Sequence, residues 1–189
     1  MHAPRRTGSP PSRFARILFV PAILALVPGG AASTGRRNHG STPPVVAISL
    51  GYAREWLEVP ECRALYDDFS DAGGRPLSEV LRERGLSPAD ALDDLAFEIG
   101  DHAGRCEEPG VVAFTAVGTP AVKVCLYRLV EAFRRDPREA AAILLHEQLH
   151  ALGLGENPPS SREITLRILE RCSARPRQPR GTRRTRQSW

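Results

Sequence analysis

The sequence has no Cys-x-x-Cys pair, and this absence excludes a zinc site built from closely spaced cysteines. It also has no long apolar run: the longest near the N-terminus, residues 17–27, is too short to span a bilayer comfortably. No cysteine follows that run closely, so a lipoprotein anchor is not expected. No internal repeat is visible, which leaves one ordinary domain as the expected organisation.

The first 33 residues are typical of a secretory signal peptide. Four arginines precede the apolar run without any acidic residue, and the small residues 29–33 follow it. The alternative, an uncleaved membrane anchor, is disfavoured by the short run. We therefore expect a secreted or otherwise exported protein, extracellular or periplasmic, with no stable membrane insertion after signal cleavage. Residues 34–44 are polar and rich in Gly, Ser and Pro, and are expected to be a linker.

Acidic residues are missing from both ends of the chain. Residues 34–170 carry 15 basic and 22 acidic side chains, whereas residues 171–189 carry seven arginines and no acid. The folded body is therefore acidic, which argues against a nucleic-acid partner. The Arg-rich tail, residues 173–189, is expected to be disordered. It is either a solvated tail or a contact for an anionic envelope polymer.

The four cysteines all lie in the expected domain, residues 45–172. An exported chain meets an oxidising compartment, so an even count predicts two disulfides. Three pairings can be drawn. We favour Cys62–Cys106 with Cys125–Cys172, because each would close a loop of roughly 45 residues, for which loop entropy predicts a useful stabilisation.

The hydrophobic pattern predicts an α+β fold. Residues 45–50 (VVAISL) are β-branched and predict a buried strand, and residues 111–117 and 121–125 predict a hairpin around Gly118. Helices are expected at the remaining periodic segments, residues 60–69, 77–84, 87–100 and 126–133.

Asp136-Pro137-Arg138-Glu139 is a strong helix start, and the helix it opens is expected to end at Gly153. That helix carries HEQLH, residues 146–150. His146 and His150 are four residues apart, so both imidazoles project from one face and can reach one Zn²⁺ ion. Glu147 stands beside the first histidine, where it can act as a general base without binding the metal.

Chance is the alternative explanation for this pattern. However, the surrounding helix is strongly apolar, and two imidazoles and a carboxylate on it would be costly to bury without compensation. A bound metal removes that objection, so we favour one zinc ion per chain.

The stretch HEQLHALGLGE, residues 146–156, resembles the zincin metallopeptidases and, in particular, their metzincin branch. The metzincin pattern is H-E-x-x-H-x-x-G-x-x-H, and His146, Glu147, His150 and Gly153 match it. Glu156 stands where the third histidine is expected. Metzincins also have a methionine turn, whereas Met1 is the only methionine here. The resemblance implies a small zincin-like domain: a short sheet with a hairpin, an active-site helix and a following helix.

The third metal ligand has two candidates. Glu156 is favoured because Gly153 and Gly155 allow the chain to turn back toward the metal. Glu163 is the alternative, because another zincin branch takes its third ligand from a glutamate on a later helix. Glu163 also has a structural explanation, since residues 160–163 (SSRE) form a capping box.

Other polar residues are weaker candidates. His102, Tyr66 and Tyr127 are considered as substrate or oxyanion contacts, although surface or core roles are more common for such residues. In zincins an edge strand lies antiparallel to the substrate, and either strand of the expected hairpin can play that part.

The sequence therefore predicts an exported, disulfide-stabilised zinc metallopeptidase acting on a peptide or protein substrate. The alternatives are a zinc amidase or other non-peptide hydrolase, and a non-catalytic domain whose metal is structural. An open coordination position on the metal would indicate a catalytic site, whereas four protein ligands would indicate a structural one.

Overall fold

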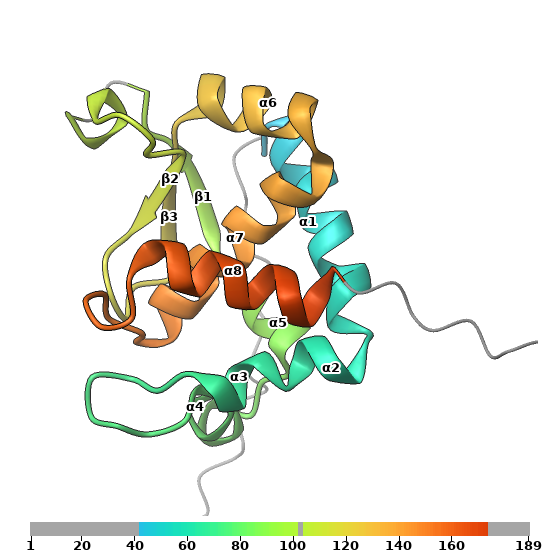
Figure 1. Ribbon diagram of the computed structural model, residues 1–189, viewed down its shortest axis with the longest axis vertical. Coiled ribbons are helices and arrows are strands. Elements are labelled where there is room, and N and C mark those ends of the chain that lie inside the picture. The colour runs from blue at the N-terminus through green and yellow to red at the C-terminus, as the bar shows by residue number, and fades with distance from the viewer. Residues whose placement is uncertain (1–41, 102–103, 174–189) are drawn as a thin grey trace, which may run out of the picture. The chain divides into compact units, whose positions relative to one another are not determined.

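The computed structural model describes residues 42–101 and 104–173. The expected signal peptide, most of the linker, His102 and all of the Arg-rich tail except Ser173 lie outside these residues. The described chain is a mixed α+β fold, as expected: a small three-stranded sheet lies to one side of the helices (Figure 1). Within this part, every helix is too short or too polar to cross a membrane.

Helix α7, Pro137–Leu152, is the centre of the fold. It packs against α1, α4, α5, α6, α8 and β2. Asp136 caps its first turn by accepting a hydrogen bond from the Arg138 N–H at 2.9 Å, and Pro137 occupies the first helical position. From Ala140 to its end, every residue except Ile143 is buried. The expected helix is confirmed, and its burial makes its polar side chains informative.

The strand expected at residues 45–50 is wrong: this segment begins helix α1, Pro44–Leu57. Its buried residues, Val46, Leu50, Ala53 and Leu57, recur at intervals of three and four and form one helical face. That face packs against α7. The β-branched start suggested a strand, but tertiary packing of the longer periodic segment outweighs local preference.

The helix expected over residues 87–100 is shorter than predicted, and a strand was missed. Ser87 and Asp90 form a capping box at the start of α5, Pro88–Asp93, as expected. The chain then continues as β1, Ala96–Ile99, which pairs in parallel with β3. Parallel pairing joins segments far apart in sequence, so no local pattern revealed this partner.

The expected hairpin is confirmed as β2, Ala113–Thr115, paired antiparallel with β3, Ala121–Val124. The strand order is β1-β3-β2, so β2 is an edge strand. The turn is tied to α7 because the Gly118 N–H donates to the His150 carbonyl at 2.8 Å. The hairpin is therefore fixed next to the histidine pair.

The remaining helices agree with the sequence in position more than in extent. The helix expected at residues 60–69 is divided at Ala64 into α2 and α3, and the expected helix after Pro159 is present as α8. Their bounds are α2 Pro60–Arg63, α3 Leu65–Asp68, α4 Leu77–Arg84, η1 Gly104–Glu107, α6 Leu126–Arg135 and α8 Ser161–Cys172. Gly85, with a positive φ, ends α4 as expected.

The four cysteines form two disulfides, as expected, but the expected pairing is wrong. Cys62 pairs with Cys172, and Cys106 pairs with Cys125. Cys62 lies on α2 and Cys172 ends α8, and these two helices pack together. Loop length alone could not reveal this packing, which decides which sulfur atoms meet. Two disulfides are consistent with an oxidising compartment outside the cytosol.

Candidate metal centre

Three side chains converge at the C-terminal half of α7: His146, His150 and Glu156. The two Nε2 atoms are 2.9 Å apart. Glu156 Oε1 lies 3.5 Å from His146 Nε2 and 3.2 Å from His150 Nε2. These three groups therefore present their donor atoms to one point and can hold a metal ion.

The outer nitrogens of both imidazoles have partners that fix the ring orientation. His150 Nδ1 lies 2.7 Å from the Leu154 carbonyl, which can only accept, so Nδ1 carries the proton. His146 Nδ1 lies 3.1 Å from Thr165 Oγ1, whose own hydrogen goes to the Ser161 carbonyl at 3.1 Å. Thr165 therefore accepts from Nδ1–H. Both Nε2 atoms are left with a lone pair, which is the form that binds a metal.

The charge state of His146 supports a cation between these groups. Burial, followed by the nearby His150, lowers the pKa of His146 to about 4. A neutral His146 cannot form an ion pair with Glu156, although the two are within 3.5 Å. Two lone pairs on buried imidazoles then face the exposed Glu156 carboxylate, an arrangement that a bound cation would stabilise.

The spacing fits a tetrahedral metal. Ligands at about 2.0–2.1 Å in a tetrahedron are separated by about 3.3 Å. The observed separations of 2.9, 3.2 and 3.5 Å lie on either side of that value. The site therefore needs only small side-chain adjustments to accept such an ion.

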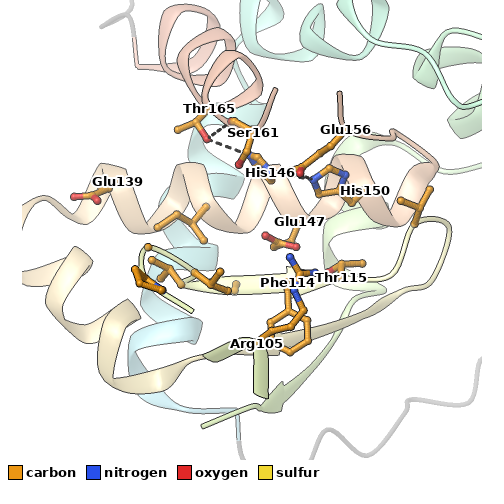
Figure 2. Close-up of a pocket in the computed structure, with 17 residues that line it drawn as sticks. Arg105, Phe114, Thr115, Glu139, His146, Glu147, His150, Glu156, Ser161 and Thr165 are labelled. Atoms are coloured by element: carbon orange, nitrogen blue, oxygen red, sulfur yellow. Dashed lines mark hydrogen bonds and ion pairs between the residues drawn. The ribbon is translucent and has the colours of Figure 1, made fainter. Parts of the chain in front are cut away.

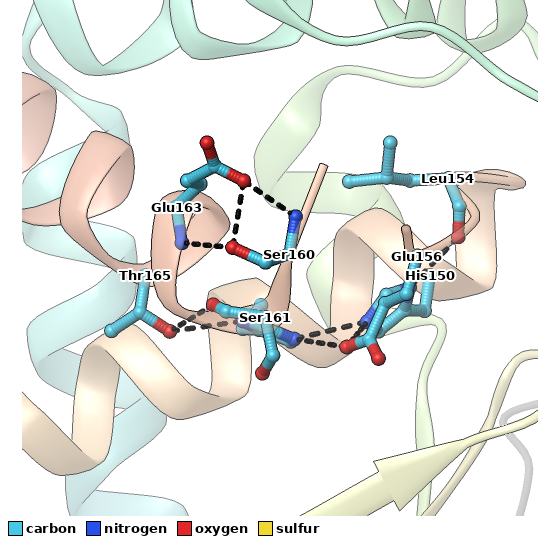
Figure 3. Close-up of polar contacts among 8 residues, drawn as sticks. His150, Leu154, Glu156, Ser160, Ser161, Glu163 and Thr165 are labelled. Carbon is cyan, nitrogen blue, oxygen red and sulfur yellow. Dashed lines mark hydrogen bonds and ion pairs between the residues drawn. The ribbon is translucent and has the colours of Figure 1, made fainter. Parts of the chain in front are cut away.

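Glu156, and not Glu163, lies with the histidines (Figure 3). The Glu163 carboxylate is 2.7 Å from both the N–H and the hydroxyl of Ser160, where it completes the capping box of α8. These hydrogen bonds lower the pKa of Glu163. The structural role considered for Glu163 is present, and its carboxylate is outside the cluster.

A glycine turn brings Glu156 back to the helix. Gly153 ends α7 with φ of 118°, a conformation that favours glycine. A Cβ atom there would also lie 3.1 Å from the Asp71 Cβ atom. The Leu154 N–H then bonds the Leu149 carbonyl at 3.0 Å, while the Leu154 carbonyl accepts from His150. One turn thus orients His150 and returns the chain toward the metal site.

Glu147 is buried beside the cluster but does not belong to it. Its Oε2 atom has no hydrogen-bond partner among the described residues, and the same is true of Thr115 Oγ1 on β2. Burial raises the pKa of Glu147 to about 7, although the nearby His150 and Thr115 oppose this shift. A buried carboxyl group without a full set of partners is costly and suggests a chemical role.

A cleft of about 620 Å³ opens onto these groups (Figure 2). Edge strand β2 and the preceding segment form one wall, and α7 forms another. His146, Glu147, His150 and Glu156 all line it. The candidate metal centre is therefore accessible to a ligand larger than water.

The opposite side of α7 is anchored by a buried hydrogen-bond chain. Tyr66 donates to Gln148 Oε1 at 2.7 Å, and Gln148 Nε2 donates to the Pro88 carbonyl at 2.7 Å. Tyr66 and Gln148 are almost fully buried. This chain joins α3, α7 and α5 and restrains the rotation of the helix that carries the histidines.

Of the weaker candidates, Tyr66 is therefore a packing residue and Tyr127 is 73% exposed on α6, outside the cleft. His102 lies outside the described residues. Sequence reasoning missed Arg105, Thr165 and the Leu154 carbonyl. No sequence signal marks Thr165 or Arg105, because their roles depend on contacts made by the folded chain.

Comparisons of the chain with protein-family models, with curated proteins and with solved structures found no match. The chemistry of this centre must therefore be inferred from its own residues.

Proposed function

We propose that this chain is an exported, zinc-dependent metallopeptidase. The observation that carries the proposal is the arrangement at the cleft: His146, His150 and Glu156 share one point, and Glu147 stands beside them as a non-ligand. The two disulfides support export. The resemblance of residues 146–156 to zincins agrees with this arrangement.

Zinc is the metal that best suits these donors. Two imidazole nitrogens and one carboxylate oxygen form a common catalytic zinc set, which leaves a fourth position for water or substrate. A bound zinc ion supplies Lewis acidity, lowering the pKa of water and polarising a carbonyl group. One ion per chain is expected.

Glu147 is the proposed general base. It accepts the proton of the attacking water and passes it to the leaving amine. Its Oε2 atom is buried without a hydrogen-bond partner among the described residues, so it is available to accept that proton. Thr165 and the Leu154 carbonyl hold the two imidazoles in the ligand-ready orientation during this step.

Edge strand β2 is the proposed docking site for an extended peptide. Ala113, Phe114 and Thr115 all line the cleft, and in the described sheet β2 has a neighbour on one side only. An extended substrate can add to such an edge through backbone hydrogen bonds. The resemblance to zincins implies a substrate that lies antiparallel to an edge strand, and β2 is such a strand on the wall of the cleft.

Two alternatives remain distinct from this proposal. A zinc amidase or other non-peptide hydrolase would use the same centre on another acyl compound. A purely structural zinc would need four protein ligands. Among residues 42–101 and 104–173, the cluster offers three, which favours catalysis over the structural alternative.

The test compares zinc-loaded wild type with Glu147→Gln on a broad peptide library read by mass spectrometry. Glu147→Gln should keep one zinc per chain and lose at least about 10²-fold in rate, the lower figure for a general base. Glu131→Gln is the matched control, since it makes the same change on the exposed part of α6, away from the cleft. A zinc-loaded wild type that cleaves no peptide would contradict the proposal.

A further inference from the structure

Arg105 is the one Arg or Lys among the described residues that line the cleft. Its exposed side chain makes no hydrogen bond or ion pair with another described residue, although most arginine side chains in the described part of the chain do. Figure 2 shows its guanidinium group beside Phe114, on the side of the cleft that faces Glu147. A positive charge without a partner, next to a hydrolytic centre, indicates a role toward the ligand.

The guanidinium group is oriented by an aromatic ring. Its carbon lies 5.1 Å from the Phe114 ring centroid, within the range of a cation–π contact. Such a contact engages the flat face of the group and leaves its N–H edge available. That edge is a planar fork, which matches the two oxygens of a carboxylate.

The backbone around Arg105 is held in place. Cys106, the next residue, is covalently joined to Cys125 at the start of α6. The Arg128 guanidinium group donates to the Val111 carbonyl at 2.8 Å and also to the Glu108 carbonyl. One covalent bond and two hydrogen bonds therefore fix the segment that presents Arg105 to the cleft.

Two of the three acidic residues that line the cleft have other contacts. Glu139 pairs with Arg135 at 2.7 Å, and Glu156 faces the two histidines. Burial raises the pKa of Glu147 and the charge of Arg105 partly offsets this rise, but the two side chains form no ion pair within 4.0 Å. The cleft thus contains a cationic side chain that forms no ion pair within 4.0 Å with any described carboxylate.

We propose that Arg105 binds a carboxylate of the substrate next to the scissile amide, so that the preferred substrates are peptides with an anionic group at that place. The inference rests on the proposed peptidase function. The carboxylate can come from a peptide C-terminus or from an Asp or Glu side chain. Both offer the same planar pair of oxygens.

The experiment uses one short Ala/Leu peptide in matched forms. One form has a free C-terminal carboxylate, one is the C-terminal amide, and further amides carry a single Asp or Asn at each position in turn. Hydrolysis is measured for zinc-loaded wild type, Arg105→Gln and Arg105→Lys. Arg134→Gln, on the exposed surface of α6, is the matched control for loss of one positive charge.

Wild type should favour either the free acid or an Asp-containing amide over its neutral counterpart by about ten- to hundredfold. Arg105→Gln should abolish the preference, because it slows hydrolysis of the anionic peptide and leaves hydrolysis of the neutral peptide unchanged. Arg105→Lys should retain part of the preference. Arg134→Gln should match wild type. Preference for the free acid identifies the C-terminus, and preference for Asp identifies a side chain.

Equal losses on anionic and neutral peptides in Arg105→Gln would overturn the inference, as would a wild type without any anionic preference. A binding measurement separates this failure from failure of the proposed function. Zinc-loaded Glu147→Gln is titrated calorimetrically with the acid and amide peptides, with and without Arg105→Gln. If wild type cleaves nothing, this titration still decides whether Arg105 recognises the carboxylate.

Discussion

Thr165→Val should weaken metal binding without touching a ligand. Thr165 Oγ1 lies 3.1 Å from His146 Nδ1 and accepts its proton, while donating its own hydrogen to the Ser161 carbonyl. Valine keeps the branched shape and removes the acceptor. The His146 ring then loses the contact that fixes its orientation and its tautomer.

The expected loss follows from this contact. Removing an outer partner of a metal-binding histidine costs about 10- to 100-fold in metal affinity, or about 1.4–2.7 kcal/mol. Thr165 is only partly buried, so water can reach Nδ1 and replace some of the lost interaction. We therefore expect a loss near the lower end, about tenfold.

The assay is a competition titration of zinc between the protein and a chromophoric chelator, at fixed pH. Thr115→Val is the matched control: Thr115 lines the same cleft and is buried, but its hydroxyl makes no hydrogen bond to either histidine. Its variant should bind zinc as wild type does. Equal affinities for Thr165→Val and wild type, with both proteins folded, would refute the reasoning.

Three further predictions test the ligands, the packing and the disulfides. Glu156→Gln should lose zinc on dialysis, as measured by elemental analysis. Glu163→Gln should keep its zinc and, in a thermal melt, unfold at a slightly lower temperature, because it loses only a helix cap. The reverse result would make Glu163 the ligand. Tyr66→Phe should cost about 1–3 kcal/mol in denaturant unfolding, because it leaves the buried Gln148 Oε1 atom without its donor; an unchanged midpoint would show that the bond is unimportant. Replacing both Cys62 and Cys172 should lower the free energy of unfolding by about 5 kcal/mol, and replacing Cys106 and Cys125 by about 3 kcal/mol. The difference is expected because the paired cysteines are 110 and 19 residues apart. Equal losses of stability would argue against the loop-entropy origin.

The sequence predicted best what depends on neighbouring residues. Asp136 and Gly153 mark the ends of α7, and Ser160 with Glu163 marks the start of α8, because caps and glycine turns are local chemistry. The i, i+4 spacing of His146 and His150 also follows from the helix alone. The hairpin was predicted for the same reason, since its strands are adjacent in the chain.

The sequence failed where partners are distant. The start of α1 was interpreted as a strand because its packing against α7 cannot be read from residues 45–50. Strand β1 depends on a parallel neighbour 25 residues later in register, Ala96 with Ala121. The disulfide pairing depends on the packing of α2 against α8. Arg105 and Thr165 were missed because tertiary contacts alone bring them to the cleft.

Helix α7 buries four polar side chains in succession or nearly so: His146, Glu147, Gln148 and His150. Three of them have partners that satisfy their outer atoms, namely Thr165 for His146, the Leu154 carbonyl for His150, and Tyr66 with the Pro88 carbonyl for Gln148. Glu147 is the exception, because its Oε2 atom is buried without a hydrogen-bond partner in the described chain. A helix that needed polar residues only for packing would leave no such carboxylate beside this cluster of possible metal ligands, because no described hydrogen bond to Oε2 recovers the cost. The unsatisfied group is the one to which the proposed mechanism assigns proton transfer. The energetic cost and the proposed chemistry therefore fall on the same residue.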